Sequence, residues 1–377
     1  MKKRLEVVIL CMATCMTMLT QNVVTADSTQ QAGWDVERMD EELIRELDDV
    51  VVERKRKPLM TRVMDGVTDF FMGCDTTYVT PQKYQFTAQL EVSYWHDYYF
   101  MRSSQTNNTM VIQSDPSVIL GGNVYFGIFG YGAVWNMNDL GIKAGKTNGT
   151  SLRQSFVIHT AKIFAEYYMF NSGKGAEIRS VSNIDLRGKD RAFHGLDSRC
   201  NGLSAMYMFN NRHFSWPAAF GANAVQRKSC GSWSVGFQYN HQAISFDKSE
   251  LPDYIQTGID STLLFTHVDY SDYSVSVGYN YNCVMGRNVL FAVSLIPSIG
   301  YRRSNITEAQ LEHSIFNSIS TDVNLRMSFF WNNTKLFSGL ILEAHTYDYR
   351  KDQFGLTNTY GTLKYLLGFN FWKKPHY

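Results

Sequence analysis

The sequence lacks several features that point to common functional classes. Its 36 basic and 35 acidic residues leave a formal net charge of only +1, so it has no global positive field that would attract nucleic acid. No glycine-rich phosphate loop joins a strand to a helix, and no zinc or calcium spacing occurs. We therefore predict no catalytic, cofactor-binding or metal-binding residue, no cofactor and no nucleic-acid partner.

Proline and cysteine are also scarce. The chain has 7 prolines and 6 cysteines in 377 residues, and it has less Ala, Leu and Glu than a helical enzyme of this size usually has. The cysteines beyond the N-terminal apolar segment form no CxxC motif and have no histidine at metal-ligand spacing: Cys74, Cys200, Cys230 and Cys283. These absences disfavour a helical enzyme and a cysteine-bound metal.

Aromatic residues, by contrast, are abundant. The chain has 22 Tyr and 24 Phe, and residue types that favour strands therefore dominate its apolar content. Hydrophobic residues make up 44% of the sequence, which excludes a disordered chain. The composition predicts an all-β protein.

The N-terminus has the pattern of an export signal. Residues 2–4 are basic, residues 7–19 are mostly apolar, and Val24-Thr25-Ala26 fits a small-residue cleavage site. Because the apolar run is too short to span a membrane as a helix, the pattern favours a cleavable signal peptide over residues 1–26.

The residues after this signal predict one amphipathic helix. In residues 34–57, apolar residues recur at helical spacing and charges fill the other face. Such a helix either docks a periplasmic partner or serves as a spacer. We predict that residues 27–80 form an N-terminal periplasmic segment containing this short helix.

From residue 84 onward the apolar pattern has a period of two. In "DYSVSVGYNYNCV" (272–284), bulky apolar residues alternate with small or polar ones, which is typical of a strand with one apolar and one polar face. The same alternation predicts twelve strands, at residues 84–97, 117–127, 129–138, 152–168, 176–187, 198–210, 230–246, 269–284, 288–302, 317–332, 335–350 and 358–372.

The composition of the two faces favours a membrane barrel over a soluble sandwich. The polar faces carry Ser, Gly, Asn and Gln, and the apolar faces run without a charge over longer segments than the roughly 5–6 residues of soluble strands. A tilted membrane strand needs about 9–11 residues, and aromatics gather near the ends of the apolar faces as interfacial girdles require. Because hydrocarbon offers no hydrogen-bond partners, the sheet must close on itself.

We therefore predict an all-β fold in which residues 81–377 form an antiparallel transmembrane β-barrel of about 12 strands. We predict that this barrel lies in the outer membrane, where outer-membrane lipid is its partner. A secreted soluble β protein is the alternative.

The lengths of the connections support this arrangement. If the N-terminal segment is periplasmic, the long connections fall outside the cell and the short turns fall in the periplasm. Residues 211–229 are the exception, because they form a long connection on the periplasmic side.

That exceptional stretch carries a family resemblance. The sequence "NRHFSWPAAFGANAVQRKSCGS" (211–232) resembles a recurring Phe-Ser-Tyr-Pro-Ala-Ala-Phe stretch followed by Gln-Lys-Arg-Ser-Ala-Gly-Ser. The two stretches belong to a family of uncharacterised exported Bacteroidetes proteins, domain of unknown function 4421. The matching residues are Phe214, Ser215, Trp216, Pro217, Ala218, Ala219, Phe220, Gln226, Arg227, Lys228, Ser229, Gly231 and Ser232. Trp216 in place of Tyr, and Cys230 in place of Ala, are mild departures. The resemblance covers roughly residues 60–377 and implies an outer-membrane barrel with no assigned activity.

The residues of this segment allow two interpretations. Phe214, Trp216 and Phe220 would pack around the rigid Pro217, with positive charges nearby on Arg212, His213, Arg227 and Lys228. The segment either folds back to seal the periplasmic mouth of the barrel or docks an anionic partner or lipid phosphate.

Charged residues with interior parity complete the predicted site: Glu91, Asp322, Arg326, Glu343 and Lys364. In a narrow lumen they must pair with one another or be hydrated, so they form either a plug of ion pairs or the lining of a small pore. We predict an outer-membrane barrel of unassigned activity that is a structural or assembly component, or a narrow conduit for small solutes.

A lipid hydrolase embedded in the membrane is the alternative class, although an enzyme is not favoured. Its candidate groups are Ser215 with His213, or Ser198 with His194 and Asp197. The first group falls in a connection rather than a strand, and the second combines residue types that often occur together by chance.

Overall fold

The computed structural model describes residues 71–103, 106–115, 117–137, 152–172, 175–221, 224–257, 267–308, 311–351 and 354–374. The predicted signal peptide (1–26) and the predicted helix at 34–57 lie outside these residues. None of the helices in the described ranges is long and apolar enough to cross a membrane.

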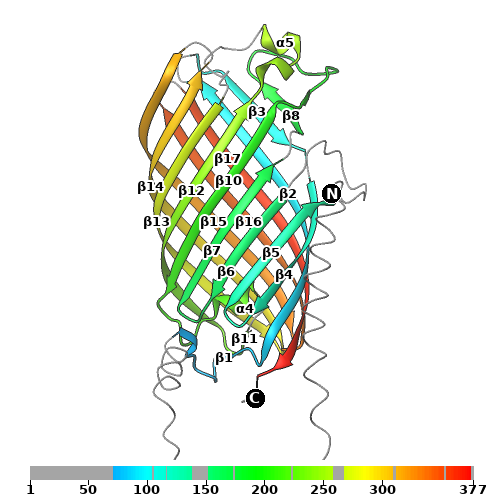
Figure 1. The fold of residues 1–377 in the computed structure, drawn as a ribbon, viewed down its shortest axis with the longest axis vertical. Helices are drawn as coiled ribbons and strands as arrows, with labels where there is room; N and C mark the ends of the chain where they lie inside the picture. The colour runs from blue at the N-terminus through cyan, green and yellow to red at the C-terminus, as the bar shows by residue number, and fades with distance from the viewer. Residues whose placement is uncertain are drawn as a thin grey trace, which may run out of the picture. The chain divides into compact units, whose positions relative to one another are not determined.

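Twelve strands form the wall of a closed antiparallel barrel (Figure 1). The ring closes because β17 pairs with β2, from Phe354 opposite Ser103 to Lys373 opposite Tyr84. In chain order the wall strands are β2 (Tyr84–Ser103), β4 (Ser117–Phe126), β5 (Phe129–Asn136), β6 (Leu152–His159), β7 (Ile163–Ser172), β10 (Leu196–Met208), β12 (Cys230–Phe246), β13 (His267–Gly286), β14 (Val289–Glu308), β15 (Leu311–Asn332), β16 (Leu336–Lys351) and β17 (Phe354–Lys373). The predicted fold class is confirmed.

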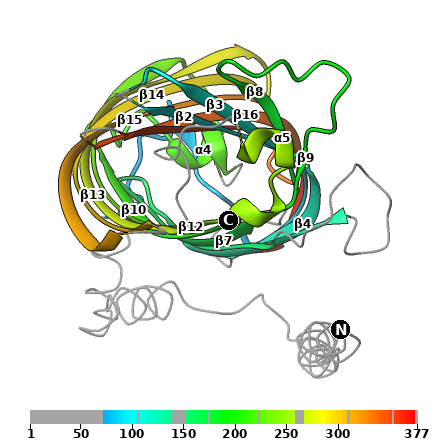
Figure 2. The ribbon, with the colours of Figure 1, turned by 90° about the horizontal axis from the view of Figure 1, so that it is seen from above.

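The remaining elements lie at the two ends of the barrel. The α4 end carries α4 (Trp216–Phe220) and a two-stranded sheet of β1 (Val79–Thr80) and β11 (Val225–Gln226). The α5 end carries α5 (Asp253–Gln256), the short 3₁₀ helix Lys248–Glu250, and the strands β3 (Thr109–Ser114), β8 (Ala176–Val181) and β9 (Ala192–Phe193). Seen from above, α4 lies within the outline of the barrel (Figure 2).

The predicted strand count is right, but two of the predicted strands are wrong. Residues 152–168 are a hairpin and not one strand, because β6 and β7 turn at residues 160–162. The hydroxyl of Thr160 stabilises this turn by accepting from the backbone N–H of Ile163 at 2.7 Å. The predicted strand at 176–187 is β8 in part, and β8 pairs with β3 and β9 and not with the wall. As a result, β7 ends at Ser172 toward the α5 end, opposite Ser198 near the start of β10.

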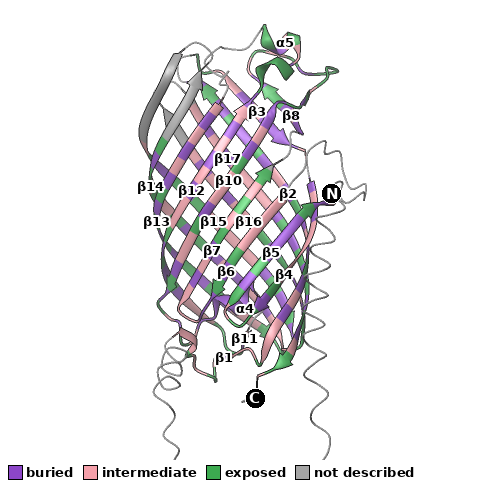
Figure 3. Cartoon of the chain, in the orientation of Figure 1, coloured by how far each residue is buried: buried purple, intermediate pink, exposed green. Residues whose placement is uncertain are grey.

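Burial alternates along the wall strands as the period-two pattern predicts (Figure 3). On β13, Val275 and Val277 are each 56% exposed on the outer face, whereas Ser274 and Ser276 are 3% and 1% exposed on the inner face. The outer face therefore consists of large apolar side chains, and the small polar residues face the interior.

Aromatic rings on the outer face gather at two levels. Toward the α4 end, Trp233 and Tyr279 pack edge to face with ring centroids 5.2 Å apart. Toward the α5 end, Tyr239 and Tyr273 pack with centroids 5.1 Å apart. These two levels bound an apolar band, as interfacial girdles bound the hydrocarbon region of a membrane barrel.

This band predicts that the cost of a buried charge depends on depth. Val277→Arg places a charge between the two aromatic levels and is expected to cost about 2–4 kcal/mol of folding free energy. Ile319→Arg is the control, because Ile319 is 76% exposed and pairs with Tyr301 near the α5-end level. It is expected to cost about 0–1 kcal/mol. Urea unfolding in lipid vesicles measures both, and equal costs would contradict the placement of the band.

Candidate functional site

The interior of the barrel is filled at the α4 end by the connection between β10 and β12. Ser215 caps α4, because its hydroxyl accepts from the backbone N–H of Ala218 at 3.2 Å, and Pro217 suits the first turn. Trp216 is 1% exposed and packs on Phe164 and Phe220, with ring centroids 5.4 and 4.5 Å apart. This short helix presents aromatic side chains to the lumen.

Polar side chains of later wall strands hold α4 in place. Ser328 of β15 donates to the carbonyl of Ala219 at 2.6 Å, and Asn282 of β13 donates to the carbonyl of Ser215 at 3.0 Å. The Ala219 carbonyl is at the end of the helix, where carbonyls lack an intrahelical donor, and the Ser215 carbonyl also accepts from the backbone N–H of Ala219 at 3.3 Å. The interior serine and asparagine positions thus bind the helix itself.

The second half of the family-like segment ties this connection to the wall. The Gln226 side chain donates to the carbonyl of His213 at 2.6 Å and accepts from the backbone N–H of Ser215 and from Asn282, each at 3.0 Å. Ser229 accepts from the backbone N–H of Val284 at 2.8 Å.

Two further members of the segment also make short contacts. Ser232 accepts from the backbone N–H of Asn210 at 3.0 Å. At Gly231 the backbone lies so close to Tyr279 that the Cβ atom of any other residue would be only 2.1 Å from the tyrosine hydroxyl.

The basic residues of this segment contact neighbouring residues of the same end. Arg227 donates to the Thr80 hydroxyl at 2.7 Å, and the Lys228 ammonium lies 4.9 Å from the centroid of the Tyr78 ring. Both partners lie at or beside β1, so these contacts fasten β1 beside β11. They give no support to a docking patch for an anionic partner.

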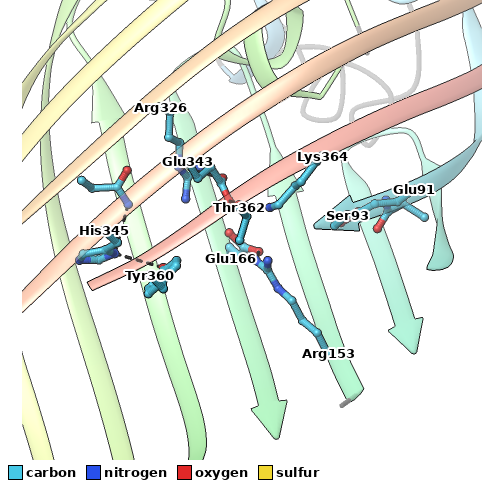
Figure 4. Close-up of polar contacts among 12 residues, drawn as sticks. Glu91, Ser93, Arg153, Glu166, Arg326, Glu343, His345, Tyr360, Thr362 and Lys364 are labelled. Carbon is cyan, nitrogen blue, oxygen red and sulfur yellow. Dashed lines mark hydrogen bonds and ion pairs between the residues drawn. The ribbon is translucent and has the colours of Figure 1, made fainter. Parts of the chain in front are cut away.

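A layer of paired charges lies in the lumen (Figure 4). Glu343 of β16 pairs with Lys364 of β17 at 2.6 Å and with Arg326 of β15 at 3.2 Å. Arg153 of β6 pairs with Glu166 of β7 at 3.3 Å. We call these five residues, together with Glu91, the charge layer; Glu91 accepts from Ser93 at 2.7 Å and from Asn123 at 3.0 Å.

A second group of charges lies on β13, β14 and β15. Arg302 is fully buried and donates to Asp272 at 2.7 Å, with Asp322 at 3.8 Å. Its guanidinium also lies 4.6 Å from the centroid of the Tyr270 ring. Asp322 therefore belongs to this group and not to the charge layer.

The structure thus brings four of the five predicted lumen charges together: Glu91, Arg326, Glu343 and Lys364. The sequence analysis missed Arg153, Glu166, Asp272 and Arg302. Interior parity marks Asp272, because it alternates with Ser274 and Ser276. Glu166 had no such signal, since both faces of β7 carry aromatic residues and the hairpin before it was not recognised.

Two small cavities flank the charge layer, each with a volume of about 80 Å³. Arg153, Glu166, Arg326 and Glu343 line both. One cavity, which we call the lower cavity, is also lined by Trp216 and Phe220 of α4. The other, the upper cavity, reaches Tyr99 toward the α5 end. The charge layer therefore separates two spaces within the lumen.

The α5 end carries a cluster of buried apolar side chains. Tyr99 and Met101 of β2, Ile178 of β8, Phe193 of β9 and Ile255 of α5 are each no more than 3% exposed. They belong to one continuous cluster, which we call the apolar cap. It joins the wall strands to β3, β8, β9 and α5.

The candidate hydrolase groups do not come together. The Ser215 hydroxyl caps α4, and Ser198 accepts from Gln242 at 3.2 Å; in the described ranges neither serine has a histidine as a hydrogen-bond partner. His213 lies instead 2.9 Å from the Asn210 side-chain oxygen and 3.6 Å from the carboxylate of Asp75. The backbone N–H of Thr77 donates to Asp75 at 2.8 Å and lowers the pKa of this carboxyl.

The described residues also lack the arrangement that a metal site needs. Among the residues that the structure describes, no three His, Cys, Asp and Glu side chains are placed to hold a metal ion.

Residues 74–371 match the family described as domain of unknown function (DUF4421). The chain belongs to this family. No curated protein matches the sequence. This DUF4421 chain has the fold of an outer-membrane β-barrel.

Solved structures with a remote likeness are themselves outer-membrane proteins. The outer-membrane protease OmpT of Escherichia coli is 8% identical with a TM-score of 0.35, over 76% of this chain and 96% of that one. The COG4313 outer-membrane channel of Pseudomonas putida F1 is 12% identical with a TM-score of 0.33, over 77% and 97%. The β domain of the Bordetella autotransporter BrkA is 9% identical with a TM-score of 0.33, over 75% and 100%. These likenesses are too remote to say what this chain does.

The charge layer predicts that Glu343 stabilises the barrel. Glu343→Gln leaves Arg326 and Lys364 facing each other without their carboxylate, which should cost about 3–5 kcal/mol. Glu177→Gln is the matched control, because Glu177 also pairs with two arginines, at 3.4 and 3.2 Å, but these side chains are 30–42% exposed. Its expected cost is at most about 1 kcal/mol.

Unfolding in urea measures both variants. Equal losses of stability would show that the lumen charges are hydrated like those on the surface.

Proposed function

We propose that this protein is an outer-membrane barrel with a closed interior, which serves as a structural or assembly component and not as an open pore. The carrying observation is that three successive fillings occupy the lumen: α4, the charge layer and the apolar cap. Each is built from side chains that are buried or at most 19% exposed and that contact one another. Since a conducting pore needs a continuous water path, this arrangement favours closure.

The location in the outer membrane is part of this proposal. The apolar band bounded by two aromatic levels supports it, and so does the predicted signal peptide. In this proposal the α4 end faces the periplasm, because the N-terminal segment precedes β1 there. The predicted helix at 34–57 then lies in the periplasm, where it is available to a partner. Cleavage of the signal peptide and a Bacteroidetes source stay predictions from the sequence.

A narrow conduit for small solutes is the second candidate. The two cavities favour it, because they already provide space within the lumen. A solute would then have to pass only α4, the charge layer and the apolar cap. No comparable observation favours a lipid hydrolase, since Ser215 and Ser198 have other hydrogen-bond partners.

Conductance in a planar lipid bilayer tests closure. The wild-type protein is expected to show no steady current. The double variant Trp216→Ala/Phe220→Ala removes the aromatic side chains of α4 and is expected to stay silent as well, because the charge layer and the apolar cap still occupy the lumen. The matched control is Trp233→Ala/Phe237→Ala, which removes the same residue types from the outer face, where they are 59% and 46% exposed.

The control is expected to stay silent. Steady current through the wild-type protein would reject closure and favour the conduit.

Surface labelling tests the direction of the barrel. A short epitope inserted after Lys189, between β8 and β9 at the α5 end, should be labelled by antibody on intact cells. The same epitope after Thr334, between β15 and β16 at the α4 end, should be labelled only after the outer membrane is opened. The reverse pattern would mean that the α5 end faces the periplasm.

A further inference from the structure

The upper cavity has an aromatic wall. Trp95 is stacked between Phe170 and Tyr360, with ring centroids 4.6 and 4.9 Å apart, and all three rings line the cavity. Tyr168 and Tyr347 line it as well. Such a wall excludes water and strengthens any electrostatic interaction within the cavity.

One carboxylate in this wall has no cationic partner. Asp97 of β2 is 4% exposed and accepts a hydrogen bond at 2.8 Å from the indole N–H of Trp95. No ion pair joins Asp97 to a basic side chain in the described part of the chain. Glu166 and Glu343, the other carboxylates that line the upper cavity, are both paired with arginine.

The formal charges around the upper cavity therefore do not balance. Asp97, Glu166 and Glu343 supply three negative charges, and Arg153 and Arg326 supply two positive ones, so one negative charge remains. Adding Glu91 and Lys364, the other two residues of the charge layer, leaves the same surplus of one. Because an unpaired buried charge is costly, the cavity favours a guest with a single positive charge.

Hydrogen-bond acceptors without donors line the same cavity. The side-chain oxygen of Asn358 has no partner, and this residue is 5% exposed. The side-chain oxygen of Asn324 also lacks a partner. Buried polar atoms are normally satisfied, so these oxygens indicate a guest that donates hydrogen bonds.

We propose that the upper cavity binds a small organic ammonium ion, with Asp97 as its counter-ion and the side-chain oxygen of Asn358, on the neighbouring strand β17, as an acceptor. The N–H groups of such an ion satisfy Asp97 and Asn358, and its alkyl part contacts the aromatic wall. With about 80 Å³ the cavity admits only a few heavy atoms, since benzene occupies an engineered cavity of about 150 Å³. Methylammonium is of this size. Tyr99 belongs to both the cavity wall and the apolar cap, so the cap is the barrier that the ion crosses.

Ligand-dependent thermal stability of the full chain in detergent micelles tests this site. The protein is refolded in methylammonium chloride or in sodium chloride at equal ionic strength, so that entry through the cap does not limit binding. Tryptophan fluorescence then gives Tm. Methylammonium is expected to raise the Tm of the wild type in a saturable way, because it binds the folded state. In Asp97→Asn the apparent affinity should fall at least about tenfold.

Two further variants make the outcome decisive. Asp322→Asn removes a different buried carboxylate and leaves Arg302 paired with Asp272, so it should keep the methylammonium response. Asn358→Leu keeps Asp97 and should weaken the affinity several-fold, which preserves the test if Asp97→Asn does not fold.

Three results would overturn the proposal. The first is a Tm of the wild type that does not respond to methylammonium, which would make Asp97 a neutral acid. The second is an equal response to sodium, which would make the guest an inorganic cation. The third is an undiminished response in Asp97→Asn or, where that variant does not fold, in Asn358→Leu.

Discussion

The structure depends on one constraint: in a sheet with a lipid-facing surface, every backbone N–H and C=O group must find its hydrogen-bond partner within the sheet. The pairing of β17 with β2 meets this requirement, and it joins residues from the two ends of the described chain. Closure creates an interior as well as a wall. A ring of twelve strands is too wide for wall side chains of ordinary size to meet across it everywhere, so further elements have to occupy the lumen or water does. Here the connection between β10 and β12 supplies α4 for one end, and β3, β8, β9 and α5 supply the apolar cap for the other.

The interior face is small and polar for reasons other than hydration alone. Ser328 and Asn282 donate their hydrogen bonds to the carbonyls of α4. Gly339 and Gly368 make room for aromatic rings, because a Cβ atom at these positions would lie 2.2 Å from Phe330 and 2.0 Å from Phe337. The polar pattern that sequence analysis associates with a wet lumen therefore also describes a lumen packed against an internal helix. The internal helix α4 could not be predicted from the alternation itself, since an open barrel and a filled barrel share that alternation.

The closed barrel and the parity of most faces could be predicted from the sequence, because a period of two over long segments is typical of strands and does not occur in helices. The predicted count of twelve agrees because two errors cancel: residues 152–168 form two wall strands, and residues 176–187 form none. The hairpin at residues 160–162 could not be predicted. Its turn contains no Gly, Pro, Asn or Asp, and apolar residues continue on both sides of it. That error concealed Glu166, and with it half of the Arg153–Glu166 pair. The ion pairs within the charge layer could not be predicted from the sequence either. Parity places Arg326, Glu343 and Lys364 inside the barrel, but it does not give the register between strands, which brings these side chains to the same height. The role of Gln226 needed the folded connection, in which one amide bonds His213, Ser215 and Asn282.

The position of α4 in the chain couples the filling of the lumen to the closure of the ring. The helix follows β10, but its anchors are on β13 and β15, with sequence separations of 67 for Asn282 and 109 for Ser328. It can be fully held only after those strands have paired. In the charge layer the ion pairs themselves join neighbouring strands, and only its two halves, on β6 and β7 and on β15, β16 and β17, are far apart in the sequence. Contacts of such separation form late and slowly. The later strands that close the wall therefore also carry the side chains that hold α4 in the interior.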